Sequence, residues 1–212
     1  MNPIFNKNQI SETMRTMTRL LLLSAFFMLL LPRLNAQHRG QLKLGITGGV
    51  SLPGGDLRDE CSQGFDGMAT FRYFFTDRFA LGIQSGFVTM PVNEMWIEYF
   101  SRNEYPEKEA LSINYHFIPV MITADHFFAQ EGVRPYIGAG LGMTFWSATT
   151  DYLGTKTRSA LWSDFAICAH MGSLFKLSKK FDLGFSAEYQ AVIKSRVDLG
   201  YITLNGGVIW NM

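Results

Sequence analysis

This chain of 212 residues has few cysteines, a small net charge and few long apolar runs. The two cysteines, Cys61 and Cys168, are too few for a disulfide framework and match no C-x-x-C metal or redox spacing. The formal net charge is only +1 and the basic residues do not cluster, so the chain lacks the electrostatic footprint of a nucleic-acid-binding protein. Aromatic residues make up 14% of the chain and charged residues 17%, beside 20 glycines. This composition excludes disorder, collagen and coiled coil, and it favours many short strands that face an apolar surrounding.

A leucine-rich run near the N-terminus is the longest apolar stretch. Two arginines precede it and Leu34-Asn35-Ala36 follows as a cleavage site, which is the pattern of a secretory signal peptide. The run is shorter than the ~20 residues that a spanning helix needs. We therefore expect residues 1–36 to be a cleaved signal peptide and residues 37–212 to be one exported domain, with Met14 or Met17 as alternative starts.

After the signal, large apolar residues alternate with small or polar ones in eight segments. Phe181 to Ala191 shows the pattern most clearly, because every second residue from Phe181 is apolar and Asp182 and Glu188 lie on the other face. Each segment has 9 to 13 residues, which matches the ~9–11 tilted residues of a membrane-crossing strand. The segments are residues 42–52, 65–75, 79–87, 111–123, 133–145, 163–175, 181–191 and 200–212.

The polar faces of these segments favour a closed barrel in lipid. They carry glycine repeatedly, as in Gly138, Gly140 and Gly142, and small residues suit the crowded interior of a narrow barrel. Short connections such as Thr76–Arg78 alternate with longer ones, as periplasmic turns alternate with extracellular loops. The sequence therefore predicts an all-β fold: an eight-stranded antiparallel transmembrane up-and-down β-barrel with both termini on the periplasmic side.

Three segments resemble those of known barrels: Arg134 to Gly142, Ile118-Pro119-Val120, and Leu183 to Tyr189. They are similar to the small eight-stranded outer-membrane barrels, the OmpA/OmpX-like and PorT-like porin-family domains, and the similarity extends over residues 40–212. It implies a protein of the Gram-negative outer membrane that contacts outer-membrane lipid and the assembly machinery. The chain departs from that pattern by ending in Met212 instead of phenylalanine. Proline within a strand removes a ladder hydrogen bond, so we also expect a bulge at Pro119.

Ionisable residues at inward positions are candidates for a network in the lumen. An unpaired charge away from bulk water costs several kcal/mol, so these side chains should pair. The interior of an eight-stranded barrel is only wide enough to be filled by side chains. We therefore expect a structural network that fills the lumen and no conducting pore. Its predicted members are Lys43, Asp66, Arg72, Asp164, Asp182 and Glu188.

Three further side chains, His116, Cys168 and His170, are also expected to face inward. Cys168 and His170 are two residues apart on one strand and could share a metal ion, which His116 could join. No recognised motif connects them, and inward histidines commonly hydrogen-bond within such networks. Neither of the two inward histidines, His116 and His170, is expected at a loop mouth beside a serine and a carboxylate. The sequence therefore assigns no catalytic, metal or cofactor site.

The longest connection combines aromatic and acidic residues. Trp96, Tyr99, Phe100 and Tyr105 stand among five glutamates and form a candidate contact surface for a protein partner. The alternative is that these rings extend the strands and pack on one another. The sequence thus favours a non-enzymatic outer-membrane barrel that acts structurally or through its extracellular loops, in adhesion or membrane integrity.

Two other functions stay open at this point. The PorT-like resemblance implies an accessory role in a secretion apparatus. A soluble exported barrel of lipocalin type would turn the apolar faces inward around a ligand.

Overall fold

The computed structural model describes residues 39–98, 111–193 and 198–212, and the structural statements below concern these residues. The predicted signal peptide, residues 1–36, lies outside them, as do Tyr99, Phe100 and Tyr105.

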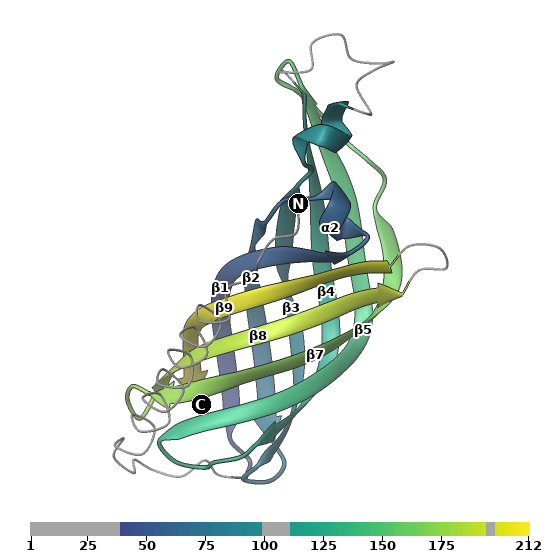
Figure 1. Cartoon of the computed structure of the whole chain (residues 1–212). Coiled ribbons are helices and arrows are strands. Elements are labelled where there is room, and N and C mark those ends of the chain that lie inside the picture. Colours follow the sequence, from purple (N-terminus) through teal and green to yellow (C-terminus); the bar gives the residue numbers. More distant parts are fainter. Residues whose placement is uncertain (1–38, 99–110, 194–197) are drawn as a thin grey trace, which may run out of the picture. The chain divides into compact units, whose positions relative to one another are not determined.

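Eight antiparallel strands close into a barrel (Figure 1). Consecutive barrel strands pair with each other, and the pairing of β1 with β9 completes the circle. Closure leaves none of the eight described barrel strands at an open edge, as a barrel in hydrocarbon requires. The barrel strands are β1 (Leu42–Gly55), β2 (Gly64–Phe74), β3 (Phe79–Pro91), β4 (Leu111–Phe127), β5 (Val133–Tyr152), β7 (Trp162–Lys176), β8 (Phe181–Ile193) and β9 (Asp198–Asn211).

The two ends of the barrel differ in their connections. Three short turns lie at the end where β1 begins and β9 ends, which we call the short-turn end. The opposite long-loop end carries the helix α2 (Leu57–Glu60), a helical turn at residues 94–98, and the short strand β6 (Thr155–Arg158). β6 pairs only with the end of β5 and was not expected from the sequence. Figure 1 shows β4 and β5 extending past the ends of β8 and β9 here.

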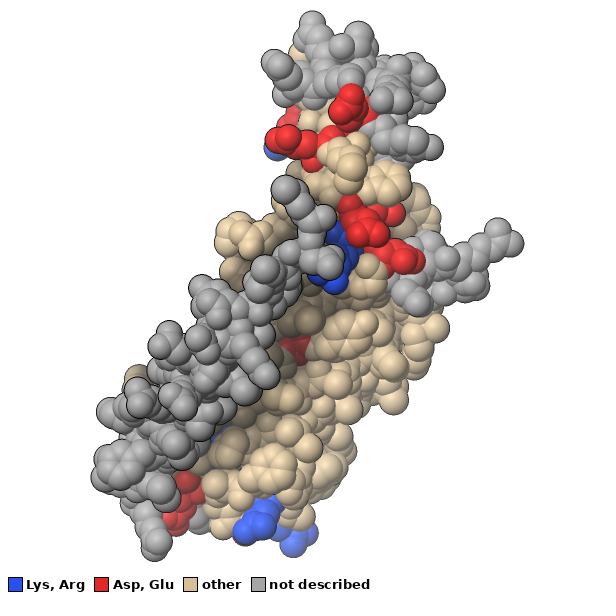
Figure 2. Space-filling view, viewed as in Figure 1, with Lys and Arg blue, Asp and Glu red and all other residues tan. Residues whose placement is uncertain are grey.

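Large apolar side chains cover the outside of the barrel. Midway along the strands Ile83 is 57% exposed and Ile122 is 62% exposed, whereas Lys43 and Asp182 are fully buried inside. Figure 2 shows charged side chains gathered mostly toward the two ends of the visible face. Such a continuous apolar surface is unfavourable in water and is typical of a barrel in lipid. The lipocalin alternative requires the reverse arrangement and is therefore wrong.

The expected alternation is confirmed in seven of the eight segments and is wrong in β4. Phe117 and Met121 were expected to face outward, yet both are completely buried. His116 was expected inside, but it is half-buried and stacks on exposed Phe87 with ring centroids 5.3 Å apart. The physical reason is that β4 carries large apolar residues on both faces, so alternation does not determine which side faces the lumen.

Pro119 interrupts one ladder without shifting it. β3 and β4 pair up to Ser85 with Val120 and resume at Val88 with Phe117 in the same register. On the other side of β4, Pro119 pairs with Thr144 in an unbroken ladder. The predicted bulge is therefore wrong: the missing N–H opens a gap in one ladder, and no extra residue is inserted.

The outward face can be tested by placing a charge in the middle of it. Ile83 lies midway between two exposed rings of the same strand, Phe79 and Phe87. We expect Ile83→Lys to lower the free energy of unfolding in lipid vesicles by about 2–4 kcal/mol, because an ammonium group is poorly solvated at the bilayer midplane. Urea titration of the barrel in lipid vesicles would measure this difference in the free energy of unfolding. Met95→Lys, at a 71% exposed position of the long-loop end, is the control and should change stability little.

Candidate functional site

Buried apolar side chains gather at both ends of the lumen, and a charged zone separates them. The cluster at the short-turn end contains Phe74, Ala80, Phe127, Tyr136, Leu174 and Ile209. The larger cluster at the long-loop end includes Leu57 of α2, Met90, Phe117, Met121, Cys168 and Tyr201. The charged zone between them is the candidate site.

The first part of this zone joins three strands through Asp182 on β8. Its carboxylate lies 2.8 Å from Lys43 Nζ of β1 and 2.6 Å from an Arg134 nitrogen of β5. All three side chains are almost completely buried. The Lys43 ammonium also lies 5.5 Å from the centre of the Phe74 ring, in cation–π range. Two cations on one carboxylate leave this part of the lumen with a net positive charge.

The second part crosses the lumen from β2 to β7. Arg72 Nε donates to Asp125 Oδ2 at 2.8 Å, and the other oxygen of Asp125 contacts His170 Nε2. The guanidinium carbon of Arg72 also lies 5.0 Å from the centre of the Tyr136 ring. Asp125 is 0% exposed and uses both oxygens, so it is a central member of the network. Removing one partner would leave a buried charge uncompensated, which is costly.

A glycine makes the Asp125 to His170 contact possible. Gly138 of β5 pairs with Asp125 on one side and His170 on the other. A methyl group at Gly138 would collide with the Asp125 carboxylate and the His170 ring together. The inward glycine predicted from the sequence thus has a specific role here. Because Gly138 has no side chain, the side chains of the strands on either side of it can contact each other.

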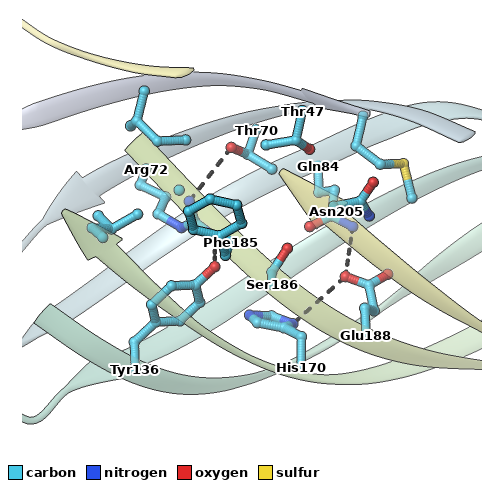
Figure 3. A pocket seen from close by; sticks show the side chains of 14 residues that line it. Thr47, Thr70, Arg72, Gln84, Tyr136, His170, Phe185, Ser186, Glu188 and Asn205 are labelled. Carbon is cyan, nitrogen blue, oxygen red and sulfur yellow. Dashed lines mark hydrogen bonds and ion pairs between the residues drawn. The ribbon is translucent and has the colours of Figure 1, made fainter. Parts of the chain in front are cut away.

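The third part surrounds Glu188 on β8. Gln84 Nε2 donates to Glu188 Oε2 at 2.7 Å, and His170 Nδ1 lies 3.8 Å from the same oxygen. Glu188 and His170 line a small cavity of about 20 Å³ together with Arg72 and Tyr136 (Figure 3). A space of this size holds about one water molecule.

The six predicted network residues all face the interior, but they do not form one connected network with one another. Lys43 and Asp182 pair directly, as do Arg72 and Asp125. Asp66 accepts from Ser51 Oγ at 3.0 Å, and Asp164 accepts from Trp146 Nε1 at 2.7 Å. Glu188 pairs with neutral Gln84.

Sequence reasoning missed two members, Asp125 and Arg134. Asp125 was assigned to a connection, whereas β4 continues to Phe127. Arg134 was placed on the inward face of its segment but was not included in the network. In the register expected for β4, Asp125 falls on the same outward face as Phe117 and Met121, so extending the period of two would not have placed it in the lumen.

The predicted contact residue Trp96 packs toward the barrel. The Trp96 ring and the aliphatic side chain of Ile97 lie against the apolar cluster at the long-loop end. Asn93 Oδ1 accepts the Trp96 backbone N–H at 3.1 Å and so begins the helical turn at residues 94–98. The other three members of the predicted surface lie outside the described residues.

Cys61 is a buried thiol at the long-loop end. It is 4% exposed, and burial, with the nearby Glu60 carboxylate, raises the pKa of its thiol to about 12. The group is therefore protonated and unreactive at neutral pH.

The Arg72 pair provides a test of the network. We expect Arg72→Met to lower the free energy of unfolding by about 3–5 kcal/mol, because Asp125 then loses its buried cation. Lys156→Met is the matched control, since the Lys156 side chain is 74% exposed and lies 3.9 Å from Asp151. It should cost less than about 1 kcal/mol. Equal losses in the two variants, measured by urea unfolding, would contradict a stabilising role for the lumen pair.

Comparisons with known proteins agree with this architecture. Neither a protein-family model nor a curated protein matches the sequence. Among solved structures, Neisserial surface protein A is similar with a TM-score of 0.58 and 15% identity, covering 82% of this chain and 100% of that one. Ail of Yersinia pestis, in complex with the heparin analogue sucrose octasulfate, is similar with a TM-score of 0.53 and 15% identity, covering 81% and 99%. This chain therefore has the fold of the small eight-stranded outer-membrane β-barrels.

Proposed function

We propose that this protein is a non-enzymatic barrel of the Gram-negative outer membrane that acts through its long-loop end, in adhesion or membrane integrity. The observation that carries this proposal is the distribution of polarity. A band of exposed apolar side chains surrounds a lumen of buried, paired charges. The short-turn end, where β1 begins and β9 ends, faces the periplasm, and residues 1–36 direct export and are then removed.

We infer that side chains fill the lumen, which favours a structural role over transport. Apolar clusters occupy both ends of the interior, and the cavity between them has a volume of about 20 Å³. Passage of a hydrated ion needs a continuous polar path of greater width. Opening one would also require breaking the buried ion pairs of Asp125 and Asp182, which is energetically costly.

The described histidines argue against hydrolytic chemistry. His170 is buried in the lumen among Asp125, Glu188 and Cys168, out of reach of an external substrate. His116 stacks on Phe87 at the outer surface, and His126 packs against Phe128 at the short-turn end. None of these three is placed at the long-loop mouth beside a serine and a carboxylate, as a surface hydrolase would need.

The long-loop end is acidic, which bears on the kind of partner it can bind. Asp56, Asp59 and Glu60 cluster at α2, and burial, followed by repulsion from Asp56 and Asp59, raises the pKa of the Glu60 carboxyl. The connection at residues 93–109 contains five glutamates against two basic residues. The sulfated ligand of the Ail complex is a polyanion. Repulsion disfavours such a ligand here, and a protein partner with apolar and basic groups fits better.

The closed lumen predicts very low conductance. The purified barrel, inserted into planar lipid bilayers, should pass no steady ion current above that of the lipid alone, because side chains fill the lumen. An open porin of the same membrane serves as the positive control for insertion and recording. Stable unitary currents from the folded barrel would overturn the non-transport part of the proposal.

The contact role predicts that the loop aromatic residues matter for attachment. We expect cells that express the intact chain to attach to protein-coated polystyrene more than empty-vector cells do. The variant Tyr99→Ser, Phe100→Ser, Tyr105→Ser should lose most of that gain, because it removes the apolar contact area. Heparin-coated polystyrene should give no gain.

Phe128→Ser is the matched control for this experiment. Phe128 is an exposed ring, 53% accessible, in a turn of the opposite end. Its substitution should leave attachment unchanged. If the triple variant attached as well as the intact chain, the aromatic contact surface would be ruled out.

A further inference from the structure

Three side chains of different chemistry converge inside the charged zone. Cys168 and His170 lie two residues apart on β7, and Glu188 of β8 pairs directly with His170. The Cys168 Sγ, a His170 nitrogen and a Glu188 oxygen all lie within 4.8 Å of one another. All three residues are buried. Thiolate, imidazole and carboxylate together form a ligand set of the kind that zinc accepts.

The distances are close to those of a coordinated ion. His170 Nδ1 lies 4.0 Å from Cys168 Sγ and 3.8 Å from Glu188 Oε2. Usual zinc bond lengths in a tetrahedron place ligand atoms about 3.3–3.6 Å apart. The two observed separations exceed this by only a few tenths of an ångström, which small side-chain rotations can provide. Figure 3 shows the His170 ring and the Glu188 carboxylate pointing toward each other.

The partners of His170 prepare its Nδ1 for a metal. Nε2 of the ring contacts Asp125 Oδ1, and Asp125 is held in place by Arg72 through its other oxygen. When Nε2 donates its hydrogen to the carboxylate, the lone pair of Nδ1 points toward Cys168 and Glu188. A carboxylate behind a ligating histidine is the common outer partner at zinc sites, where it fixes the ring and increases its basicity.

An independent observation at Glu188 points to a missing ligand. The residue is 5% exposed, and among the described residues its Oε1 has no hydrogen-bond partner, although Oε2 accepts from Gln84. A buried carboxylate oxygen without a partner is unfavourable. A cation bound by both carboxylate oxygens of Glu188, beside His170 and Cys168, would satisfy it.

The charges of the cluster agree with a divalent ion. Arg72 contributes one positive charge, and Asp125, Glu188 and a Cys168 thiolate contribute three negative ones. The resulting charge of −2 is balanced by one divalent cation, and the thiol proton is released to solvent on binding. His170 and Glu188 also line the cavity of about 20 Å³, which has room for one water as a fourth ligand.

We propose that Cys168, His170 and Glu188 form a zinc-binding site inside the barrel, with Asp125 as the outer partner of His170. The ion would join β7 to β8 and stabilise the network that crosses the lumen to β2. This site is independent of the loop function proposed above.

The site can be tested by metal content and by a cobalt spectrum. The full chain, expressed with zinc and purified in detergent, should retain about one zinc per barrel after brief exposure to a weak chelator. Refolding with Co²⁺ should give an intense near-ultraviolet band from thiolate-to-cobalt charge transfer. A folded barrel, shown by heat-modifiable gel mobility, that holds no zinc and gives no such band would overturn the proposal.

The two cysteines provide matched variants. Cys168→Ser should lose the cobalt band and lower zinc affinity at least about 10-fold, whereas Cys61→Ser should keep both, because Cys61 does not belong to the group of ligand atoms that converge at His170. Glu188→Gln retains the shape of its side chain and should also weaken zinc binding. Loss of the band in Cys61→Ser, or its full retention in Cys168→Ser, would assign the metal elsewhere and refute this site.

Discussion

The buried contact between Arg72 and Asp125 is the interaction on which the interior depends. It joins β2 to β4, and the second oxygen of Asp125 extends it to His170 on β7. In a narrow lumen a charge cannot turn toward water, so each ionised side chain must find its partner across the barrel. The network therefore links strands that share no backbone ladder. The missing side chain at Gly138 provides the space for this link.

The outside of the barrel imposes the complementary constraint. Exposed residues such as Ile83 and Ile122 gain nothing from burial within the protein, so the apolar contribution that stabilises a soluble core comes here from lipid. Closure of the sheet satisfies the backbone in that surrounding. Contact with lipid therefore stabilises the outer face of the barrel. The polar contacts of the interior determine which strands lie opposite one another.

The two ends of the barrel have separate roles in this arrangement. The apolar cluster at the long-loop end encloses the lumen and anchors Trp96 and α2. Asp56, Asp59 and Glu60 lie at the same end, where we have proposed the contact surface. Burial in the lumen also shelters the Cys168, His170 and Glu188 cluster from solvent, so an ion in the site proposed above would act on stability and not on an external substrate.

The sequence by itself determined the barrel, because a period of two with glycine-rich inward faces is a local property that each segment carries alone. It placed Lys43 and Asp182 in the lumen, where they pair. It failed for β4, since Phe117 and Ile118 are both large and apolar and no local rule selects the inward one. Only the tertiary structure decided that the Asp125 carboxylate contacts both Arg72 and His170, and that Glu188 lies opposite His170. Those contacts depend on the register and closure of non-adjacent strands, which alternation within one segment does not encode.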